Sequence, residues 1–349
     1  MQRRSTGWQR GTTMSKTLYL ECYSGISGDM TVAALLDLGA DREVLKESLK
    51  SLPVGGFRTE ITRVKKSGLD ACDFSVILEQ DNHDHDMEYL HGSEKSYTGH
   101  HEYTHSHEYP HEHRGMKEIT EIIQKSEMTA RAKKMAMRVF GILAQAESKA
   151  HGVPVEEVHF HEVGAVDSIV DIAAIAICMD NLDISNVIVP VLYEGTGFIR
   201  CQHGQIPVPV PAVTHIAETH KLKLKITDIQ GELVTPTGAA VVAAFRTSDR
   251  LPEDFTMLKT GIGAGKRQYR CPGILRAMLI RETTDIQIKD IIWKLETDMD
   301  DCGGEMMGHV MNLLMANGAR EVHYTPIYTK KNRPAYTCLL YTSDAADEL

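Results

Sequence analysis

We predict a mixed α/β (α+β) fold from three features of the sequence. Strand and helix patterns alternate from Lys16 onward, and an abruptly different histidine-rich stretch, residues 81–113, interrupts them. A later β–α–β order, from residue 286 to 328, suits half of a ferredoxin-like domain. With 349 residues, the chain is long enough for two or three domains.

These features divide the chain into a mixed α/β N-terminal region, interrupted by a disordered His-rich insertion, and an incomplete ferredoxin-like C-terminal domain. We expect a disordered leader at 1–15, an N-terminal α/β part at 16–80, the insertion at 81–114, the continuing α/β core at 115–283, a partial nucleotide-binding domain at 284–340 and a separate tail at 341–349.

Composition excludes several classes of protein. The net charge of −10 argues against a nucleic-acid surface and suits a protein that handles cations. No apolar run is long enough to cross a bilayer, and no signal-peptide pattern is present. The seven cysteines include no C-x-x-C pair, which is typical of reduced thiols in a cytoplasmic protein.

The first candidate site follows a strand at Lys16–Cys22. The sequence Y-S-G-I-S-G-D-M leads from this strand into a helix at Thr31–Leu38. A glycine-rich turn entering a helix presents backbone N–H groups, often to a phosphate. The candidate cofactor-binding residues here are Gly25, Ser27, Gly28 and Asp29, of which Asp29 could also touch a metal. The alternative is a tight turn capped by Ser27 or Asp29.

Regular elements flank the histidine-rich stretch. A helix at Asp41–Leu52 precedes two strands, Arg58–Val64 and Asp73–Glu79, which form a hairpin with Gly68 near its turn. After the stretch, the apolar period predicts helices at Met116–Gln124 and Thr129–His151.

The stretch itself holds nine of the 17 histidines and almost no aliphatic residue. It cannot bury enough apolar surface to fold, and neutral imidazoles bind divalent metals, so we predict a segment that is disordered or ordered only by a bound divalent metal. The alternative is a solvated insertion. The candidate ligands are His83, His85, His100, His101, His105, His107, His111 and His113, with His91 as the ninth histidine.

A second metal candidate is V-H-F-H-E-V-G-A-V-D-S-I-V-D at Val158–Asp171. His159 and His161 alternate, so an extended backbone would project both imidazoles from one face. Asp167 and Asp171 are four residues apart and would share one face of a helix that continues as Ile169–Leu182. Together with Glu162, these groups suit nickel or zinc. The purely structural alternative is a surface turn followed by a capped helix. A third interpretation is a metal-dependent hydrolase that uses the aspartate pair.

Glycines, prolines and threonines mark the next segments. After a strand at Val187–Val191, residues 195–212 carry three alternating prolines, which predict a rigid extended segment with His203 as a possible acid–base or metal group. Thr235 and Thr237 precede a helix at Ala239–Arg246 and form an anion-favouring helix start. Residues 260–267 read as a third glycine-rich turn, with Gly263 and Gly265 as binding candidates, ahead of a strand at Met278–Arg281.

The C-terminal region concentrates oxygen ligands. After a strand that starts near Ile286, five carboxylates precede a helix at Met306–Asn317 and a strand at Val322–Tyr328. They suit Mg²⁺ or Mn²⁺ carried with a nucleotide triphosphate, although an acidic first turn of a helix is the alternative. The residues are Glu296, Asp298, Asp300, Asp301 and Glu305, with Lys330, Lys331 and Arg333 as cations for the phosphates.

These motifs, taken in order, resemble one family. Y-S-G-I-S-G-D-M, the histidine-rich insertion, H-F-H-E-V-G-A-V-D-S-I-V-D, H-G-x-x-P-V-P, G-E-L-V-T-P-T-G-A-A and K-K-N-R-P recur in that order in the LarC nickel-insertion proteins, and the resemblance covers about Lys16 to Leu340. It implies CTP-dependent insertion of Ni²⁺ into pyridinium-3,5-bisthiocarboxylic acid mononucleotide, with release of CMP and diphosphate. The product would be the nickel-pincer nucleotide cofactor of lactate racemase-type enzymes.

The resemblance also implies roles and partners. In the family the CTP site is associated with the C-terminal domain and Mn²⁺ or Mg²⁺, so a nickel insertase or chelatase of the lyase class would use the C-terminal acidic and basic residues there. Our own hypothesis adds a fixed nickel site built around His159, His161 and Glu162. Its partners would be the dithiolated mononucleotide, CTP and a recipient racemase-type apoenzyme, in a homo-oligomer without nucleic acid or membrane. A non-enzymatic nickel chaperone or store is the alternative.

Two departures from the family pattern bear on activity. Glu296–Asp301 reads E-T-D-M-D-D where the family usually has E-T-N-x-D-D, so a carboxylate replaces an amide. Family members continue beyond this C-terminus, and Tyr341–Leu349 does not resemble their continuation. We therefore expect a truncated chain or an artefactual tail, and such a chain could bind nickel yet fail in the CTP-dependent step.

Overall fold

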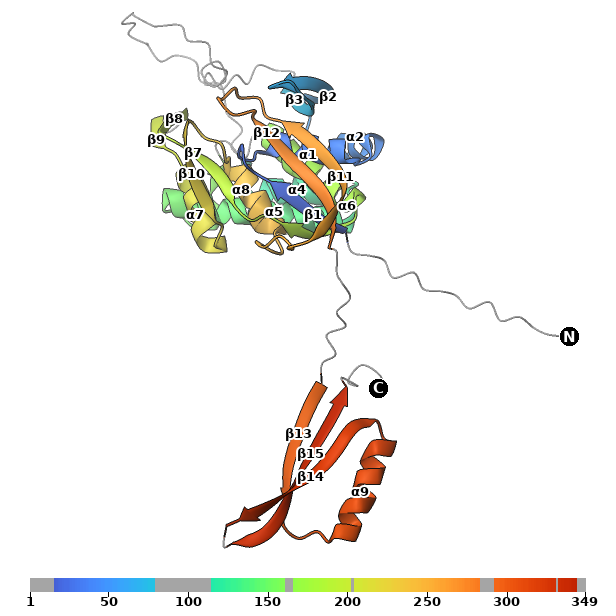
Figure 1. Ribbon diagram of the computed structural model, residues 1–349. Helices are drawn as coiled ribbons and strands as arrows, with labels where there is room; N and C mark the ends of the chain where they lie inside the picture. Colours follow the sequence, from blue (N-terminus) through green and yellow to red (C-terminus); the bar gives the residue numbers. More distant parts are fainter. Residues whose placement is uncertain are drawn as a thin grey trace, which may run out of the picture. The chain divides into compact units, whose positions relative to one another are not determined.

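The computed structural model describes residues 16–78, 114–160, 166–201, 204–282, 292–330 and 332–343. The chain divides into two compact units, Met1–Thr283 and Thr284–Leu349 (Figure 1). Both units combine helices with sheets, which confirms the mixed α/β prediction. The predicted leader and histidine-rich insertion lie outside the described residues, apart from Arg114 at the end of the insertion.

A six-stranded mixed sheet forms the centre of the N-terminal unit, in the order β2-β3-β11-β12-β1-β6. Strand β1 pairs in parallel with β6 and antiparallel with β12, and β3 meets β11 in parallel. The strands are β1 (Lys16–Glu21), β2 (Phe57–Lys66), β3 (Leu69–Leu78), β6 (Ile184–Ile188), β11 (Phe255–Ala264) and β12 (Ile274–Glu282).

Three two-stranded ladders accompany this sheet. Strand β7 pairs in parallel with β10, and the bridge between Cys22 and Leu192 connects β7 to the end of β1. Strands β8 and β9 form a hairpin, and β4 pairs with β5. Their bounds are β4 (Arg114–Gly115), β5 (His159–Phe160), β7 (Leu192–Thr196), β8 (Phe198–Cys201), β9 (Gly204–Pro207) and β10 (Leu224–Gln230).

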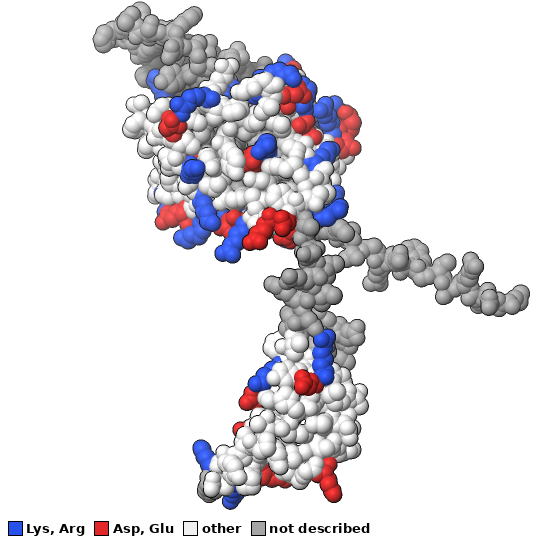
Figure 2. Space-filling view, viewed as in Figure 1, with Lys and Arg blue, Asp and Glu red and all other residues white. Residues whose placement is uncertain are grey.

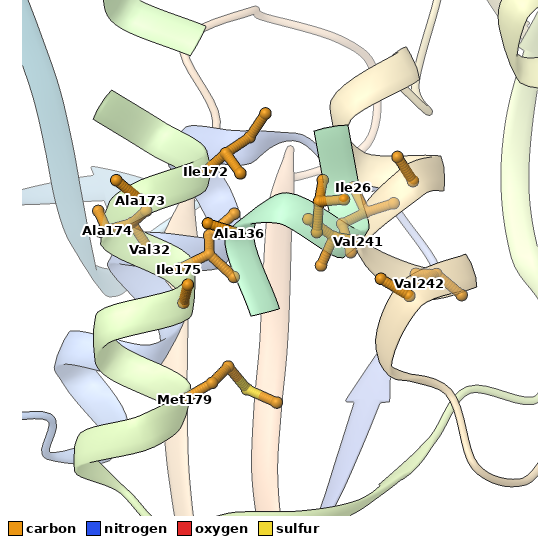
Figure 3. Packing of buried hydrophobic residues seen from close by; sticks show 14 of the residues in the cluster. Ile26, Val32, Ala136, Ile172, Ala173, Ala174, Ile175, Met179, Val241 and Val242 are labelled. Atoms are coloured by element: carbon orange, nitrogen blue, oxygen red, sulfur yellow. The ribbon is translucent and has the colours of Figure 1, made fainter. Parts of the chain in front are cut away.

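The helices of this unit build one core. Helix α1 packs on β11, β12 and β3, and the long α5 contacts α6, α7 and α8. Figure 3 shows α6 side chains such as Ile172 and Ile175 among residues from α1, α5 and α8. The elements are α1 (Gly28–Leu38), α2 (Arg42–Lys50), α4 (Met116–Lys125), α5 (Ala130–His151), the 3₁₀ turn η1 (Val155–Glu157), α6 (Val166–Asn181), α7 (Pro211–His220) and α8 (Pro236–Phe245).

Several predicted elements are confirmed, with caps where the sequence places them. Ser67 and Gly68 have positive φ in the turn between β2 and β3. Thr129 caps α5 by accepting a hydrogen bond from the Ala132 amide at 3.0 Å, and Gly152 ends the helix in the left-handed region. Helix α1 starts three residues earlier than predicted, at Gly28.

Two predictions about glycine and proline are wrong. Residues 260–264 belong to β11 rather than to a turn; a Cβ at Gly261 or Gly263 would overlap the α1 backbone, so these glycines allow close helix–sheet packing. The predicted extended segment 195–212 is wrong at its end: β8 and β9 are extended strands, but Pro211 starts α7 rather than continuing the extended chain.

The C-terminal unit is a three-stranded antiparallel sheet with one helix on it. Its strands are β13 (Ile292–Met299), β14 (Ala319–Thr329) and β15 (Arg333–Ser343), in the order β13-β15-β14, and α9 (Gly304–Ala316) packs on β14. The sequence analysis missed β15, the central strand, which runs to Ser343 and so includes the first three residues of the predicted tail 341–349. No helix among the described residues is long and apolar enough to cross a membrane.

Candidate functional site

The turn between β1 and α1 is held by a second loop. Gly25 has φ +84°, and a Cβ there would overlap the Leu233 carbonyl. The Ile26 amide donates to the Leu233 carbonyl at 3.0 Å, and the Thr235 amide donates to the Ile26 carbonyl at 3.0 Å. The glycine turn is therefore fixed against residues 231–235, which connect β10 to α8.

Two carboxylates from different helices meet at this turn. The Ser27 hydroxyl donates to Asp29 in the first turn of α1. A Cβ on Gly28 would lie 2.5 Å from the Oδ2 atom of Asp171, so the α6 carboxylate lies directly against the start of α1. Glycine at position 28 is what permits this approach.

Burial dominates the electrostatics of the pair. It raises the pKa of Asp29, opposed by the Ser27 hydrogen bond and the charge of Lys266. Burial also raises the pKa of Asp171 well above its usual range, and repulsion from Asp29 and Asp167 adds to this rise. Asp29 thus makes Asp171 harder to ionise, and a bound cation would relieve that cost.

One ammonium group lies among these acids. Lys266 donates to the Asp73 carboxylate and to the Ser75 hydroxyl, the latter at 2.6 Å. We call Asp29, Asp73, Asp167 and Asp171, together with Lys266, the acidic cluster. Four carboxylates against one ammonium favour a cation over a phosphate at this turn, which weakens the phosphate-binding interpretation of the glycine turn.

Both histidine-bearing segments adjoin the elements of the acidic cluster. Gly115 pairs with His159 and Arg114 with Phe160, so the chain leaving the histidine-rich segment is hydrogen-bonded to the start of the H-F-H-E motif. The other end of that segment continues β3, which carries Asp73. Helix α6 begins at Val166 and carries Asp167, which is exposed and accepts the Ser168 amide at 2.8 Å.

The remaining predicted nickel ligands cannot be placed. His159 lies in β5, but its side chain is outside the described parts of the structure, as are His161 and Glu162. The histidines between 83 and 113 and His203 are also outside the described residues. Their metal-binding roles remain predictions.

A buried glutamate supports the loop behind the turn. Glu194 is 0% exposed, and its Oε1 atom accepts the Gly195, Leu233 and Val234 amides at 2.7, 2.8 and 3.1 Å. Burial raises its pKa to about 7, although the three amides oppose the rise. Its Oε2 atom has no hydrogen-bond partner among the described residues.

Sequence reasoning missed Glu194. A single glutamate in the strand L-Y-E-G-T gives no periodic signal. The one usable signal was that a charged residue stands directly before a glycine in a short strand. The adjacent Glu232 pairs with Arg267 at 2.9 Å, and the Tyr269 hydroxyl donates to the Glu232 carbonyl at 2.7 Å. These contacts fix the other end of the same loop.

The threonines and the last glycine candidate contact protein atoms. Thr235 is the N-cap of α8 and accepts the Gly238 amide at 3.1 Å, while Thr237 is buried. A Cβ on Gly265 would lie 2.9 Å from the Met30 sulfur. Packing thus explains these residues without a ligand, and their binding roles stay untested.

In the C-terminal unit, several of the predicted acids and cations lie near one end of the sheet. Met299, at the end of β13, is opposite Tyr336, and the hairpin between β14 and β15 turns near Thr329 and Arg333. Asp300 and Asp301 follow β13, Glu305 lies in the first turn of α9, and Lys330 lies in the hairpin turn. Lys331 is outside the described residues.

Neither unit holds a complete set of metal ligands in its described part. Asp298 points to β15, where its carboxylate accepts the Thr337 hydroxyl at 2.6 Å, and the exposed Glu296 pairs with Lys294 at 2.8 Å. Across the described residues, no three His, Cys, Asp or Glu side chains are grouped to hold a metal ion. Figure 2 shows basic and acidic side chains interspersed on the visible face of the N-terminal unit.

Comparison with known proteins adds a family to this geometry. A family profile described as nickel insertion protein matches residues 18–348, and so includes nearly all of the segment 341–349 that the sequence analysis had set apart. No solved structure matches the chain.

The similar proteins carry consistent names. A pyridinium-3,5-bisthiocarboxylic acid mononucleotide nickel insertion protein from Alkaliphilus metalliredigens is 50% identical over 337 residues, covering 93% of this chain and 77% of the relative. A protein of the same name from Acetivibrio thermocellus is 38% identical, covering 95% and 77%. A putative nickel insertion protein from Citrifermentans bemidjiense is 39% identical, covering 95% and 78%. The chain therefore belongs to the nickel insertion protein family.

Proposed function

We propose that this chain inserts Ni²⁺ into pyridinium-3,5-bisthiocarboxylic acid mononucleotide in a CTP-dependent reaction. The product is the nickel-pincer nucleotide cofactor of lactate racemase-type enzymes. The names of the relatives support the nickel and mononucleotide parts of this proposal. The observation that supports it is the acidic cluster, a cation-favouring group of side chains whose elements β3 and α6 are continuous in sequence with the two histidine-bearing segments.

The chemistry of the acidic cluster suits transfer rather than storage. Nickel must lose water and protein ligands before sulfur captures it. Carboxylate oxygens are harder ligands than the two thiocarboxylate sulfurs of the mononucleotide, so the sulfurs would draw Ni²⁺ from Asp29 and Asp171. Lys266 lowers the net negative charge and would keep the ion from binding too firmly.

The C-terminal unit would serve CTP. Carboxylate oxygens suit Mg²⁺ or Mn²⁺, and Asp300, Asp301 and Glu305 would hold such an ion at the sheet end. Lys330 and Arg333 would contact phosphate oxygens there. The bound ion would offset the charge of the triphosphate while these side chains orient it.

The test combines the purified chain, the dithiolated mononucleotide, Ni²⁺, CTP and Mg²⁺ or Mn²⁺. We expect the nickel cofactor, scored by mass spectrometry, with CMP and diphosphate released. Glu47→Gln on the surface of α2 is a control that should change nothing. Nickel transfer without CMP would refute CTP dependence, and no transfer at all would refute the insertase function.

A nickel chaperone or store is the second candidate, favoured by the nine histidines between residues 83 and 113. Deleting residues 81–113 separates the two functions. A store would lose nearly all of its nickel capacity, measured by equilibrium dialysis. An insertase would still form cofactor when nickel is plentiful.

A further inference from the structure

Two tyrosines form an aromatic surface at the start of the glycine turn. Tyr23 is 52% exposed, and its ring centroid lies 4.9 Å from that of Tyr193 at an interplanar angle of 52°. The Tyr193 amide donates to the Cys22 carbonyl at 3.2 Å, which locks the two backbones together. Burial raises the pKa of the nearby Tyr19, and Tyr23 adds to this rise.

A lysine already occupies part of this surface. The Lys225 ammonium lies 4.7 Å from the centroid of the Tyr193 ring and donates to the Tyr193 hydroxyl at 3.3 Å. Strands β7 and β10 place Lys225 directly beside Tyr193 in parallel register. Within the described part of the chain Lys225 forms no ion pair, whereas Lys223, two residues earlier, pairs with Asp249 at 2.8 Å.

These contacts define a preference for one chemical class. The face of an aromatic ring carries negative potential and attracts cations, and Lys225 shows that the Tyr193 face does so here. A pyridinium ring is a flat cation that could stack on the exposed Tyr23 ring. An anionic group on the same ligand could then pair with Lys225, which lacks a carboxylate partner among the described residues.

We propose that Tyr23, Tyr193 and Lys225 bind the charged ring of a pyridinium carboxylate or thiocarboxylate mononucleotide. Tyr23 supplies the stacking face, Tyr193 supports it, and Lys225 contacts an anionic ring substituent. This assignment rests on the proposed function and names the part of its site that holds the substrate ring. Tyr23 lies two residues before Gly25, so the ring would be held at the turn that carries Asp29.

The test compares a cationic and a neutral form of one ligand. The probe is nicotinic acid mononucleotide, a pyridinium carboxylate, and its uncharged-ring dihydropyridine counterpart serves as reference. Binding to the full chain is measured by calorimetry. Tyr23→Leu should weaken binding of the pyridinium form by roughly fivefold to thirtyfold. It should leave binding of the dihydropyridine form within roughly twofold, because that form carries no ring charge.

Matched variants distinguish the effect of the Tyr23 ring from the effects of its hydroxyl and of the nearby lysines. Tyr23→Phe retains the aromatic face and should keep most of the affinity. Lys225→Met should weaken both forms by roughly twofold to fivefold, since both carry the carboxylate. Lys223→Met, whose ammonium pairs with Asp249, should change neither. Near-ultraviolet circular dichroism confirms that each variant is folded.

Two results would overturn the assignment. One is unchanged pyridinium affinity in folded Tyr23→Leu, and the other is an equal loss for both forms of the ligand. Nickel binding without mononucleotide, measured in parallel, distinguishes failure of the ring assignment from failure of the proposed function. If the unmodified chain bound both forms equally while still forming the nickel cofactor, this assignment alone would be refuted. If it preferred the pyridinium form but transferred no nickel, the proposed function would be refuted.

Discussion

The two units each bring acidic residues together, but by different routes. In the N-terminal unit, Asp29, Asp73 and Asp171 come from three elements far apart in sequence; each is half-buried and interacts electrostatically with Lys266. In the C-terminal unit, the acids lie within ten residues, from Glu296 to Glu305, and most of them are exposed. High local density of carboxylates therefore does not by itself produce a desolvated site, whereas helix packing does.

The largest expected effect tests the buried site. Asp29→Asn or Asp171→Asn, each in a chain lacking residues 81–113, should weaken nickel binding by roughly 10- to 100-fold, because each replaces a carboxylate beside the proposed ion with a neutral amide. Calorimetry with NiCl₂ measures this. Asp300→Asn is the matched C-terminal control and should leave nickel affinity unchanged. An equal loss of affinity in this variant would show that the acidic residues of the two units do not differ in nickel binding.

Glu194 gives the next largest effect, on stability. Its pKa rises from 4.5 to about 7 on folding, so the folded state holds the proton more firmly. Stability should therefore fall as pH rises from about 4.5 to 7 and stay level above that. Glu194→Gln should remove roughly 2 kcal/mol of this pH dependence. Urea unfolding at pH 5 and pH 8 measures this change. If Glu194→Gln kept the full dependence of the unfolding free energy on pH, that dependence could not come from Glu194.

In the C-terminal unit, Lys330 and Arg333 should affect CTP binding but not nickel binding. Lys330→Ala combined with Arg333→Ala should raise the KM for CTP by about tenfold, because two charge-assisted phosphate contacts are lost. Nickel affinity in the absence of CTP should not change. Steady-state CMP release gives the first quantity and calorimetry the second. If both quantities moved together, the two units could not have separate tasks.

The smallest effect concerns the hydrogen bond inside the C-terminal sheet. Thr337→Val removes the hydroxyl that donates to Asp298 and should lower the free energy of unfolding of this unit by about 1 kcal/mol. Thr325→Val, in the neighbouring strand β14, is the control and should cost less. Amide hydrogen exchange in β13 and β15 measures the change, and equal protection in both variants would show that Asp298 does not depend on Thr337.

Local patterns identified most helices and strands here, but not the partners of the site residues. Asp29 and Asp171 were each singled out, yet nothing local shows that α6 packs against the start of α1. Gly263 was assigned to a ligand because its pattern resembles a binding turn, whereas the α1 backbone is what requires it. Strand β15 was missed because Pro334 argues against a strand, although it sits only at the start of that strand.

The pairing of Gly115 with His159 has a consequence for how nickel is supplied. Thirty-five residues, 79–113, connect Leu78 in β3 to Arg114 in β4, and both ends are held by the same folded unit. Even fully stretched, such a loop cannot carry a histidine farther than roughly 60 Å from its anchors. An ion bound there stays at an effective concentration near the millimolar range relative to the folded unit. Delivery from this loop would then be intramolecular, with a rate independent of protein concentration.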